Sequence, residues 1–225
     1  MLKIQSMKNK KVLVPILIIV GVILIDQILK IWVKTHMVLG EEIHIFGDRV
    51  MLKFIENPGM AFGMEFGGNW GKLALSIFRI LAVGGLSWYL AVLIKKGAGL
   101  LLSSCIALII AGALGNLIDC AFYGMIFNES YFEVAQMFPE GGGYAGFLSG
   151  NVVDMFYCPV INTVLPENFP IWGGERFIFF RPIFNIADSA ITISVFIMIV
   201  FYKKIFQTVE SDKKVESEVA ETEEK

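Results

Sequence analysis

Histidine and cysteine are scarce in this sequence of 225 residues, and its net charge is small. The 2 histidines, His36 and His44, give a zinc site or a histidine-based nucleophilic triad few side chains to draw on. The 3 cysteines, Cys105, Cys120 and Cys158, are too scattered for a disulfide framework, and no CxxC pair indicates a metal. A formal net charge of -2 gives no global field that would attract nucleic acid. We therefore expect no metal, no cofactor and no nucleic-acid partner.

Apolar residues are abundant instead. They make up 56% of the chain, with a mean hydropathy of +0.66, whereas soluble domains contain about 45–50%. Four stretches reach the roughly 20 residues that a helix needs to cross a bilayer: Val12–Trp32, Leu73–Ile94, Ala98–Phe122 and Pro182–Tyr202. The first is too long for a cleaved signal peptide and ends in DQILKIWVK rather than a small-residue cleavage site. The sequence thus predicts an all-α membrane protein with four transmembrane helices, in a single domain over residues 1–205.

Lysines flank these stretches at alternate ends. They are Lys3, Lys8, Lys10 and Lys11 before the first, Lys95 and Lys96 between the second and third, and Lys203 and Lys204 after the fourth. All fall on one side if the helices alternate, and the positive-inside rule makes that side cytoplasmic. Both termini are then cytoplasmic, and loops 35–70 and 123–181 face outward. Residues 206–225, rich in Glu and Lys without aromatic residues, are expected to form a disordered cytoplasmic tail.

The outward loops contain patterns typical of strands. HIF and MLKFI alternate apolar and polar residues in the first loop, and NVVDMFY and RFIFF lie between glycine-rich turns in the second. Neither loop is long enough for a separate catalytic domain. We expect a small β-rich extracytoplasmic platform.

Polar residues at membrane depth are candidates for function, because charge is costly to place there. Asp26 and Lys30 are four apart on the first helix and can pair, and Asn116 and Asp119 are three apart at the end of the third. Structural readings stay open for both: an ion pair near a helix end, and close helix packing through GALG. Arg79 in the second helix needs a counter-ion or a route to the headgroups.

Four more candidates lie near the outer ends of the helices. Asn57 in NPGMAFG is also compatible with a turn, and Asp154 in NVVDMFY with an exposed position on an edge strand. Asp188 stands at the mouth of the fourth helix, preceded by Asn185. A small transporter that relays protons through such residues is an alternative, but it predicts polar groups at mid-depth and an internal repeat, and the sequence has neither.

These residues occur in five motifs that follow one another along the chain. The motifs are Asp26-x3-Lys30, Asn57-x-Gly59-x-Ala61-Phe62-Gly63, Gly115-Asn116-x2-Asp119, Val153-Asp154-Met155-Phe156 and Phe184-Asn185-x-Ala187-Asp188-Ser189. From about residue 12 to 205, this set resembles the lipoprotein signal peptidases (signal peptidase II), which are bacterial membrane aspartyl proteases. The resemblance implies an endopeptidase of the bacterial cytoplasmic (inner) membrane. It would act as a monomer, surrounded by membrane lipids, and remove signal peptides from diacylglyceryl-modified prelipoproteins at the outer face.

The resemblance also implies roles for individual residues. The catalytic pair is Asp154 and Asp188, of which one carboxyl would be ionised to take a proton from water and the other protonated to polarise the scissile carbonyl. The substrate pocket is lined by Asn57, Asn116 and Asn185, and the bundle is supported by Asp26 and Lys30.

Two features depart from the family's pattern. Cys120 stands where the family usually has Arg, and the stretch between GNLIDC and NVVD is longer than usual. We expect Arg79 to neutralise Asp119 or Asp26 and to take over part of the missing arginine's role. We expect the inserted residues, 125–150, to help cover the substrate's lipid-bearing cysteine.

Overall fold

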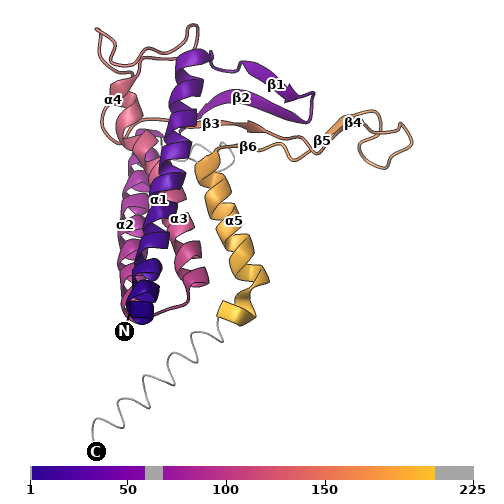
Figure 1. Cartoon of the computed structure of the whole chain (residues 1–225). Helices are drawn as coiled ribbons and strands as arrows, with labels where there is room; N and C mark the ends of the chain where they lie inside the picture. Colours follow the sequence, from indigo (N-terminus) through magenta and orange to yellow (C-terminus); the bar gives the residue numbers. More distant parts are fainter. Residues whose placement is uncertain (1, 59–67, 206–225) are drawn as a thin grey trace, which may run out of the picture. The chain divides into compact units, whose positions relative to one another are not determined.

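A computed structural model describes residues 2–58 and 68–205 (Figure 1). The helices are α1 (Leu2–His36), α2 (Gly68–Lys95), α3 (Leu100–Ile118), the π-helix η2 (Asp119–Tyr123), α4 (Gly124–Ile126) and α5 (Ile186–Val200). The strands are β1 (Glu42–Phe46), β2 (Val50–Asn57), β3 (Val152–Tyr157), β4 (Ile161–Val164), β5 (Arg176–Phe179) and β6 (Ile183–Phe184). The expected tail and most of the NPGMAFG motif lie outside the described residues.

The chain divides into two compact units. As far as their residues are described, the helical unit comprises Met1–Gln27, Ile77–Leu117 and Ile186–Lys225, and the sheet unit comprises Ile28–Ser76 and Ile118–Asn185. Both α1 and α2 contribute residues to each unit, and the unit boundary also falls near the end of α3. The single domain over residues 1–205 stays a prediction.

Three of the predicted spans are confirmed in length and composition. Asn9–His36, Gly71–Lys95 and Leu100–Ile126 are each long and apolar enough to cross a membrane. The fourth predicted helix is shorter than expected, because Ile183 and Phe184 pair with β3 as strand β6 and α5 begins only at Ile186. With 15 residues, α5 is apolar but falls short of the usual spanning length.

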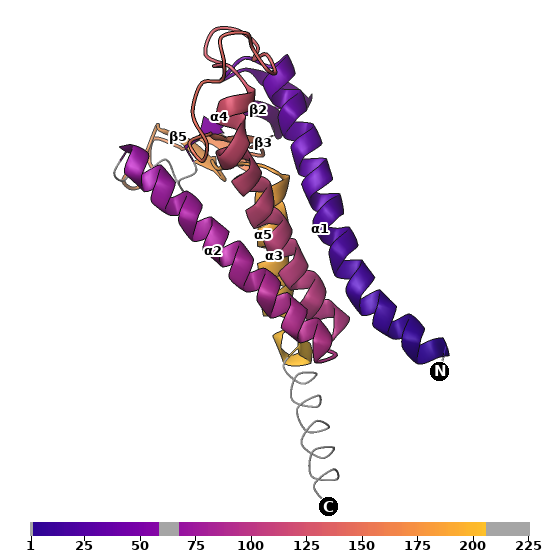
Figure 2. The ribbon, with the colours of Figure 1, turned by 90° about the vertical axis from the view of Figure 1, so that its left-hand side faces the viewer.

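Glycines in α3 allow close packing inside the helical unit, where α3 and α5 run side by side (Figures 1 and 2). A Cβ on Gly112 would lie 2.3 Å from the Ala187 carbonyl oxygen, and one on Gly115 would lie 2.7 Å from Asp26 Oδ2. Ser194 Oγ donates to the Cys105 carbonyl at 2.7 Å. Any larger residue at either glycine would push these groups apart, so the packing predicted from GALG is confirmed.

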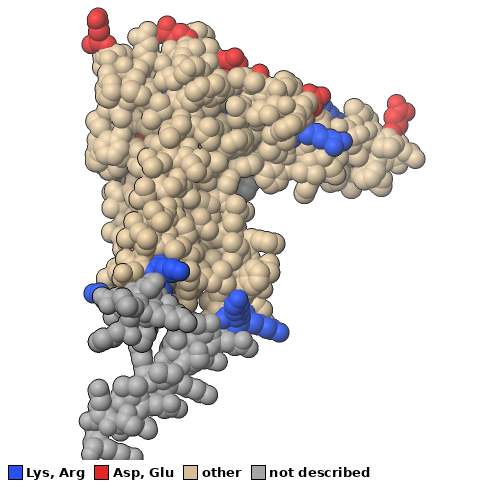
Figure 3. All heavy atoms as spheres, in the orientation of Figure 1, with Lys and Arg blue, Asp and Glu red and all other residues tan. Residues whose placement is uncertain are grey.

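The outer surface of the helical unit is apolar over most of its length. Large side chains such as Leu17, Phe78, Leu81, Trp88 and Phe196 are exposed, and the face shown in Figure 3 is largely free of charge along the helices. Exposed lysines follow one another at the end of α2 and shortly after the end of α5: Lys95, Lys96, Lys203 and Lys204. An apolar belt bounded by lysines at one end is the surface that a membrane-spanning bundle requires.

The sheet unit is built on an antiparallel sheet of order β1-β2-β3-β6. Phe54 of β2 and Val153 and Met155 of β3 pack in a core with Val33 and Met37 of α1. Because side chains alternate along a strand, Asp154 points to the face opposite Val153 and Met155. The β4–β5 hairpin forms a separate two-stranded sheet. All four strand patterns found in the sequence are confirmed as β1, β2, β3 and β5.

The inserted stretch returns to η2 and α4 and is hydrogen-bonded to them. Ala145 N donates to the Gly124 carbonyl at 2.8 Å, and Gly150 N donates to the Cys120 carbonyl at 2.9 Å. A Cβ on Gly150 would lie 2.4 Å from the Asp119 carbonyl oxygen, so only glycine allows this approach. Glycines of this stretch therefore serve close packing inside the sheet unit.

Candidate active site

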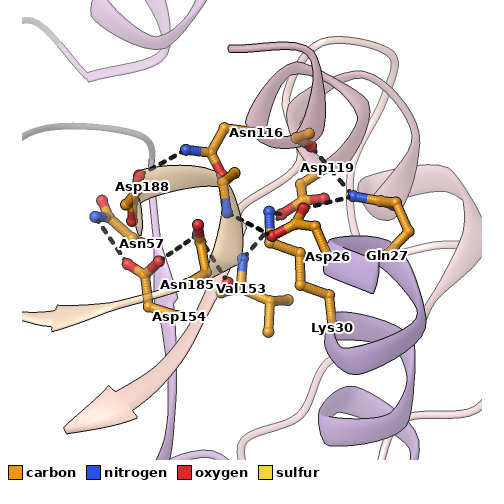
Figure 4. Close-up of polar contacts among 12 residues, drawn as sticks. Asp26, Gln27, Lys30, Asn57, Asn116, Asp119, Val153, Asp154, Asn185 and Asp188 are labelled. Atoms are coloured by element: carbon orange, nitrogen blue, oxygen red, sulfur yellow. Dashed lines mark hydrogen bonds and ion pairs between the residues drawn. The ribbon is translucent and has the colours of Figure 1, made fainter. Parts of the chain in front are cut away.

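Asp154 lies inside the sheet, in β3 between β2 and β6, and only 5% of the residue is exposed. Its Oδ1 accepts a hydrogen bond from Asn185 Nδ2 at 2.8 Å, and its Oδ2 accepts one from Asn57 Nδ2 at 3.3 Å (Figure 4). The alternative of an exposed edge-strand position is therefore wrong. Asp154 is paired with Ile55 of β2 in the ladder, and amide donors take the place of water at its carboxylate.

The two asparagines reach Asp154 from neighbouring strands. Asn57 is the last residue of β2, directly opposite Val152, and Asn185 follows immediately after β6. Asn185 also donates to the Val153 carbonyl at 3.2 Å, which ties it to the backbone beside Asp154. Asn57 is thus a partner of a buried carboxylate rather than only a turn residue.

Asp188 belongs to the helical unit and stands in the first turn of α5. Asn116 Nδ2, from α3, donates to Asp188 Oδ1 at 2.9 Å (Figure 4). One residue earlier, Ala187 N donates to Asp26 Oδ1 at 2.9 Å. The first backbone N–H groups of a helix have no partner inside the helix, so the buried Asp26 carboxylate anchors the start of α5.

Gln27 completes this support and was missed in the sequence. Its Nε2 donates to Asp26 Oδ2 and to the Gly115 carbonyl, both at 3.2 Å. Gln27 is itself a polar residue in an apolar helix, beside Asp26. Its polarity at membrane depth could have identified it as a candidate from the sequence.

Lys30 and Asp119 form an ion pair of 2.8 Å inside the sheet unit, with both side chains fully buried. Asp119 Oδ2 also accepts from Val153 N at 3.2 Å, beside Asp154. The sequence indicated Asp26 as a partner for Lys30 and did not reveal Asp119, because helical spacing finds only pairs on one helix. Asn116 and Asp119, expected on a common helix face, thus contact different elements. Asn116 donates to Asp188 of α5, whereas Asp119 accepts from the backbone of β3.

Cys120 is buried in η2 at 2% exposure, and its backbone carbonyl accepts from Gly150 N. Arg79 is half-buried on α2. Its pairing with Asp119 or Asp26 stays a prediction.

A second buried lysine was also missed. Lys34, fully buried in the last turn of α1, forms an ion pair with Glu56 of β2 and donates to Ser130 Oγ at 2.9 Å. Its position four residues after Lys30 placed it on the same helix face, which was the available signal.

Apolar helices of spanning length, together with a buried carboxylate at Asp154 and a half-buried one at Asp188 that accept hydrogen bonds from asparagines, are typical of a membrane protein with a functional polar site. The profile of the family signal peptidase (SPase) II matches residues 18–204. The lipoprotein signal peptidase of Porphyromonas gingivalis is 48% identical over 198 residues, which cover 88% of this chain and 86% of that protein. The one from Amoebophilus asiaticus is 33% identical over 207 residues, covering 89% and 84%.

Solved structures agree with these sequence matches. Two structures described as a bacterial membrane enzyme share a TM-score of 0.55 with this chain. The match to the first has 26% sequence identity and covers 86% of this chain and 89% of the solved chain. The match to the second has 27% identity and covers 84% of this chain and 92% of the solved chain. The chain belongs to the signal peptidase II family and is a membrane protease.

Proposed function

We propose that this protein is the aspartic endopeptidase that removes signal peptides from diacylglyceryl-modified prelipoproteins, with Asp154 and Asp188 as its catalytic pair. The observation that carries the proposal is that each carboxylate accepts hydrogen bonds from asparagines of the family motifs: Asp154 from Asn57 and Asn185, and Asp188 from Asn116. Family membership supports the activity and the substrate.

The covalent chain supports pairing of the two aspartates. Asn185, which donates to Asp154, is three positions before Asp188, and three residues of fully extended chain span about 11 Å at most. Asn116, which donates to Asp188, is three positions before Asp119, which accepts from Val153 N beside Asp154. Two short segments thus connect the surroundings of one carboxylate to those of the other.

In the proposed reaction one carboxylate takes a proton from water as the water oxygen attacks the scissile carbonyl carbon. The other carboxyl, protonated, donates a hydrogen bond to the carbonyl oxygen and stabilises the charge that develops there. The tetrahedral intermediate then breaks at its C–N bond, and the leaving amine receives a proton from the pair. The pair acts as a unit, so neither role is assigned to one residue.

The membrane arrangement follows from the same proposal. The protein is a monomer of the bacterial cytoplasmic membrane that crosses the bilayer four times, with α5 as the fourth span and both termini cytoplasmic. The exposed lysines at the ends of α2 and α5 support this orientation. In α5, a local thinning of the bilayer or the residues that flank the helix would make up for its length. The sheet unit then lies at the outer face, where Asn57, Asn116 and Asn185 would meet substrate amide groups.

The test is direct. The purified protein in detergent is incubated with a diacylglyceryl-modified prelipoprotein, and release of the signal peptide is followed by mass spectrometry. We expect cleavage on the N-terminal side of the modified cysteine and much slower cleavage of the unmodified precursor. Cleavage that ignores the lipid, or no cleavage of the modified precursor, would contradict the proposal.

A further inference from the structure

Residues behind the proposed catalytic strand form a polar network within the sheet unit, in which Lys34 and Ser130 are buried and the other members are half-buried. Lys34 Nζ lies 5.9, 5.4 and 5.0 Å from the ring centroids of Phe54, Phe127 and Tyr144. Its ammonium group pairs with Glu56 and donates to Ser130 Oγ at 2.9 Å. An ammonium group held among three rings and a carboxylate has lost its water, and the rings and Glu56 replace that water.

Glu56 connects Lys34 to two further residues, Ser130 and Asn151. Its Oε1 accepts from Lys34 and from Ser130 Oγ, the latter at 3.2 Å, and its Oε2 accepts from Asn151 Nδ2 at 3.2 Å. Both carboxylate oxygens are therefore occupied by donors. A network whose donors and acceptors are matched in this way is rigid, because each hydrogen bond fixes the orientation of the next.

Asn151 is the residue at which the network reaches β3. Besides its bond to Glu56, its Oδ1 accepts from Lys72 Nζ at 2.9 Å and its backbone N donates to the Tyr144 hydroxyl at 2.7 Å. Strand β3 starts at the next residue, and Asp154 follows three positions after Asn151. The start of the strand is thus held from three directions. Burial raises the pKa of the Tyr144 phenol, so the hydroxyl remains a neutral acceptor for Asn151 N.

The network and Asp154 lie on opposite faces of the same two strands. Glu56 is opposite Val153 in the ladder, and Asn57 is opposite Val152. By alternation, Glu56 faces the core while its neighbour Asn57 reaches Asp154. A shift of Glu56 or Asn151 would consequently move both partners of the Asn57–Asp154 hydrogen bond.

We propose that Lys34, Glu56 and Asn151, together with Ser130 and Tyr144 of the inserted stretch, are positioning residues that fix Asp154 and Asn57 for the reaction. The inference rests on the proposed function. It assigns the inserted stretch a role as support for the catalytic strand rather than as a cover for the substrate. Stability alone does not call for a buried ion pair, since apolar side chains of similar volume often serve as well or better.

The two roles predict different kinetics. A cover acts on substrate binding and changes KM, whereas misplacement of a catalytic carboxylate lowers kcat, by as much as about 100-fold for a displacement near 1 Å. A purely structural network would change the melting temperature without changing kcat of the folded enzyme.

The test compares kcat, KM and Tm of variants in one detergent, with the diacylglyceryl-modified prelipoprotein as substrate. Tyr144→Phe removes only the hydroxyl that accepts from Asn151 N, and Glu56→Gln keeps the shape while removing the charge. We expect each to lower kcat by about 10-fold while KM stays within about twofold. Lys34→Met should act more strongly, and Lys34→Arg should recover part of kcat because it retains the charge.

The matched control is the ion pair between Lys53 and Glu42, which joins β1 and β2 on a more exposed part of the same sheet. Lys53→Met and Glu42→Gln should leave kcat and KM unchanged. The inference would be overturned if folded Tyr144→Phe and Glu56→Gln kept the wild-type kcat, or if they changed only KM. The proposed function would still be upheld in that case, because the wild type cleaves the substrate. A wild-type protein that does not cleave would overturn both. If Lys34→Met fails to fold, the Tyr144 and Glu56 variants decide.

Discussion

Asp154 and Asp188 stand on different kinds of structure. Asp154 lies within a sheet, where the ladder to β2 and amides from Asn57 and Asn185 fix its position. Asp188 stands in the first turn of a helix whose start is anchored by Asp26 and whose carboxylate accepts from Asn116. The position of a strand depends on many ladder bonds, whereas the first turn of a helix needs partners from outside. Support of Asp154 is therefore spread over the sheet unit, and support of Asp188 is concentrated in side chains of α1 and α3.

The largest expected effect is the same for both aspartates. Asp154→Asn and Asp188→Asn should each reduce cleavage of the prelipoprotein by at least about 10²–10⁴-fold, because an amide keeps the shape but cannot exchange a proton with water. Tm should change far less than activity. Asp48→Asn, at an exposed turn beside β1, is the matched control and should cleave normally. Near-normal turnover in either active-site variant would rule out a two-aspartate mechanism.

The next prediction tests how much the sheet unit depends on its buried charge. Lys30→Met leaves Asp119 buried without this partner and should lower the free energy of unfolding by about 3–5 kcal/mol. Chemical denaturation in detergent, followed by circular dichroism, measures the change. The double variant Lys30→Met/Asp119→Asn should recover a large part of it, since the charge is then gone. A double variant no more stable than the single one would show that packing rather than charge is responsible.

A smaller effect separates the two amides around Asp154. Asn185→Ala should lower kcat/KM by about 10–100-fold, the range expected when a carboxylate loses a hydrogen bond worth about 1.5–3 kcal/mol. Asn185 also holds the Val153 carbonyl. Asn57→Ala should cost less, because its bond is longer, at 3.3 Å, and Asp154 keeps Asn185. Steady-state kinetics of both variants check the order, and the reverse order would show that Asn57 acts chiefly on substrate.

Sequence patterns predicted the local structure well, because the length of an apolar stretch indicates a membrane span and alternation of apolar and polar residues indicates a strand. Three spans and the strands β1, β2, β3 and β5 were found in this way, and GALG indicated the close packing around Gly112 and Gly115. Helical spacing could not reveal partners on other elements, so Lys30–Asp119 and Lys34–Glu56 were missed. The start of α5 was misplaced because the hydrophobicity of Ile183 and Phe184 suits a helix and a strand equally.

The smallest predicted effect concerns Arg79, which we expect to contribute to the support of either Asp188 or Asp154. A guanidinium that is half-buried on an apolar helix gains from a nearby carboxylate, and Asp26 and Asp119 are the acids we expect it to serve. Coupling to Asp26 would make Arg79 part of the anchor of α5 and hence of Asp188. Coupling to Asp119 would instead join it to the backbone contact beside Asp154.

Double-mutant cycles distinguish the two. Arg79→Met is combined with Asp26→Asn and, separately, with Asp119→Asn, and the free energy of unfolding and kcat/KM are measured for every variant. We expect a coupling above about 1 kcal/mol in one of the cycles. Lys96→Met, at the exposed residue that follows α2, replaces Arg79→Met in the control cycles and should be additive with both acids. Additivity in both Arg79 cycles would mean that its side chain reaches the headgroups along its stem instead. Neither carboxylate would then depend on it.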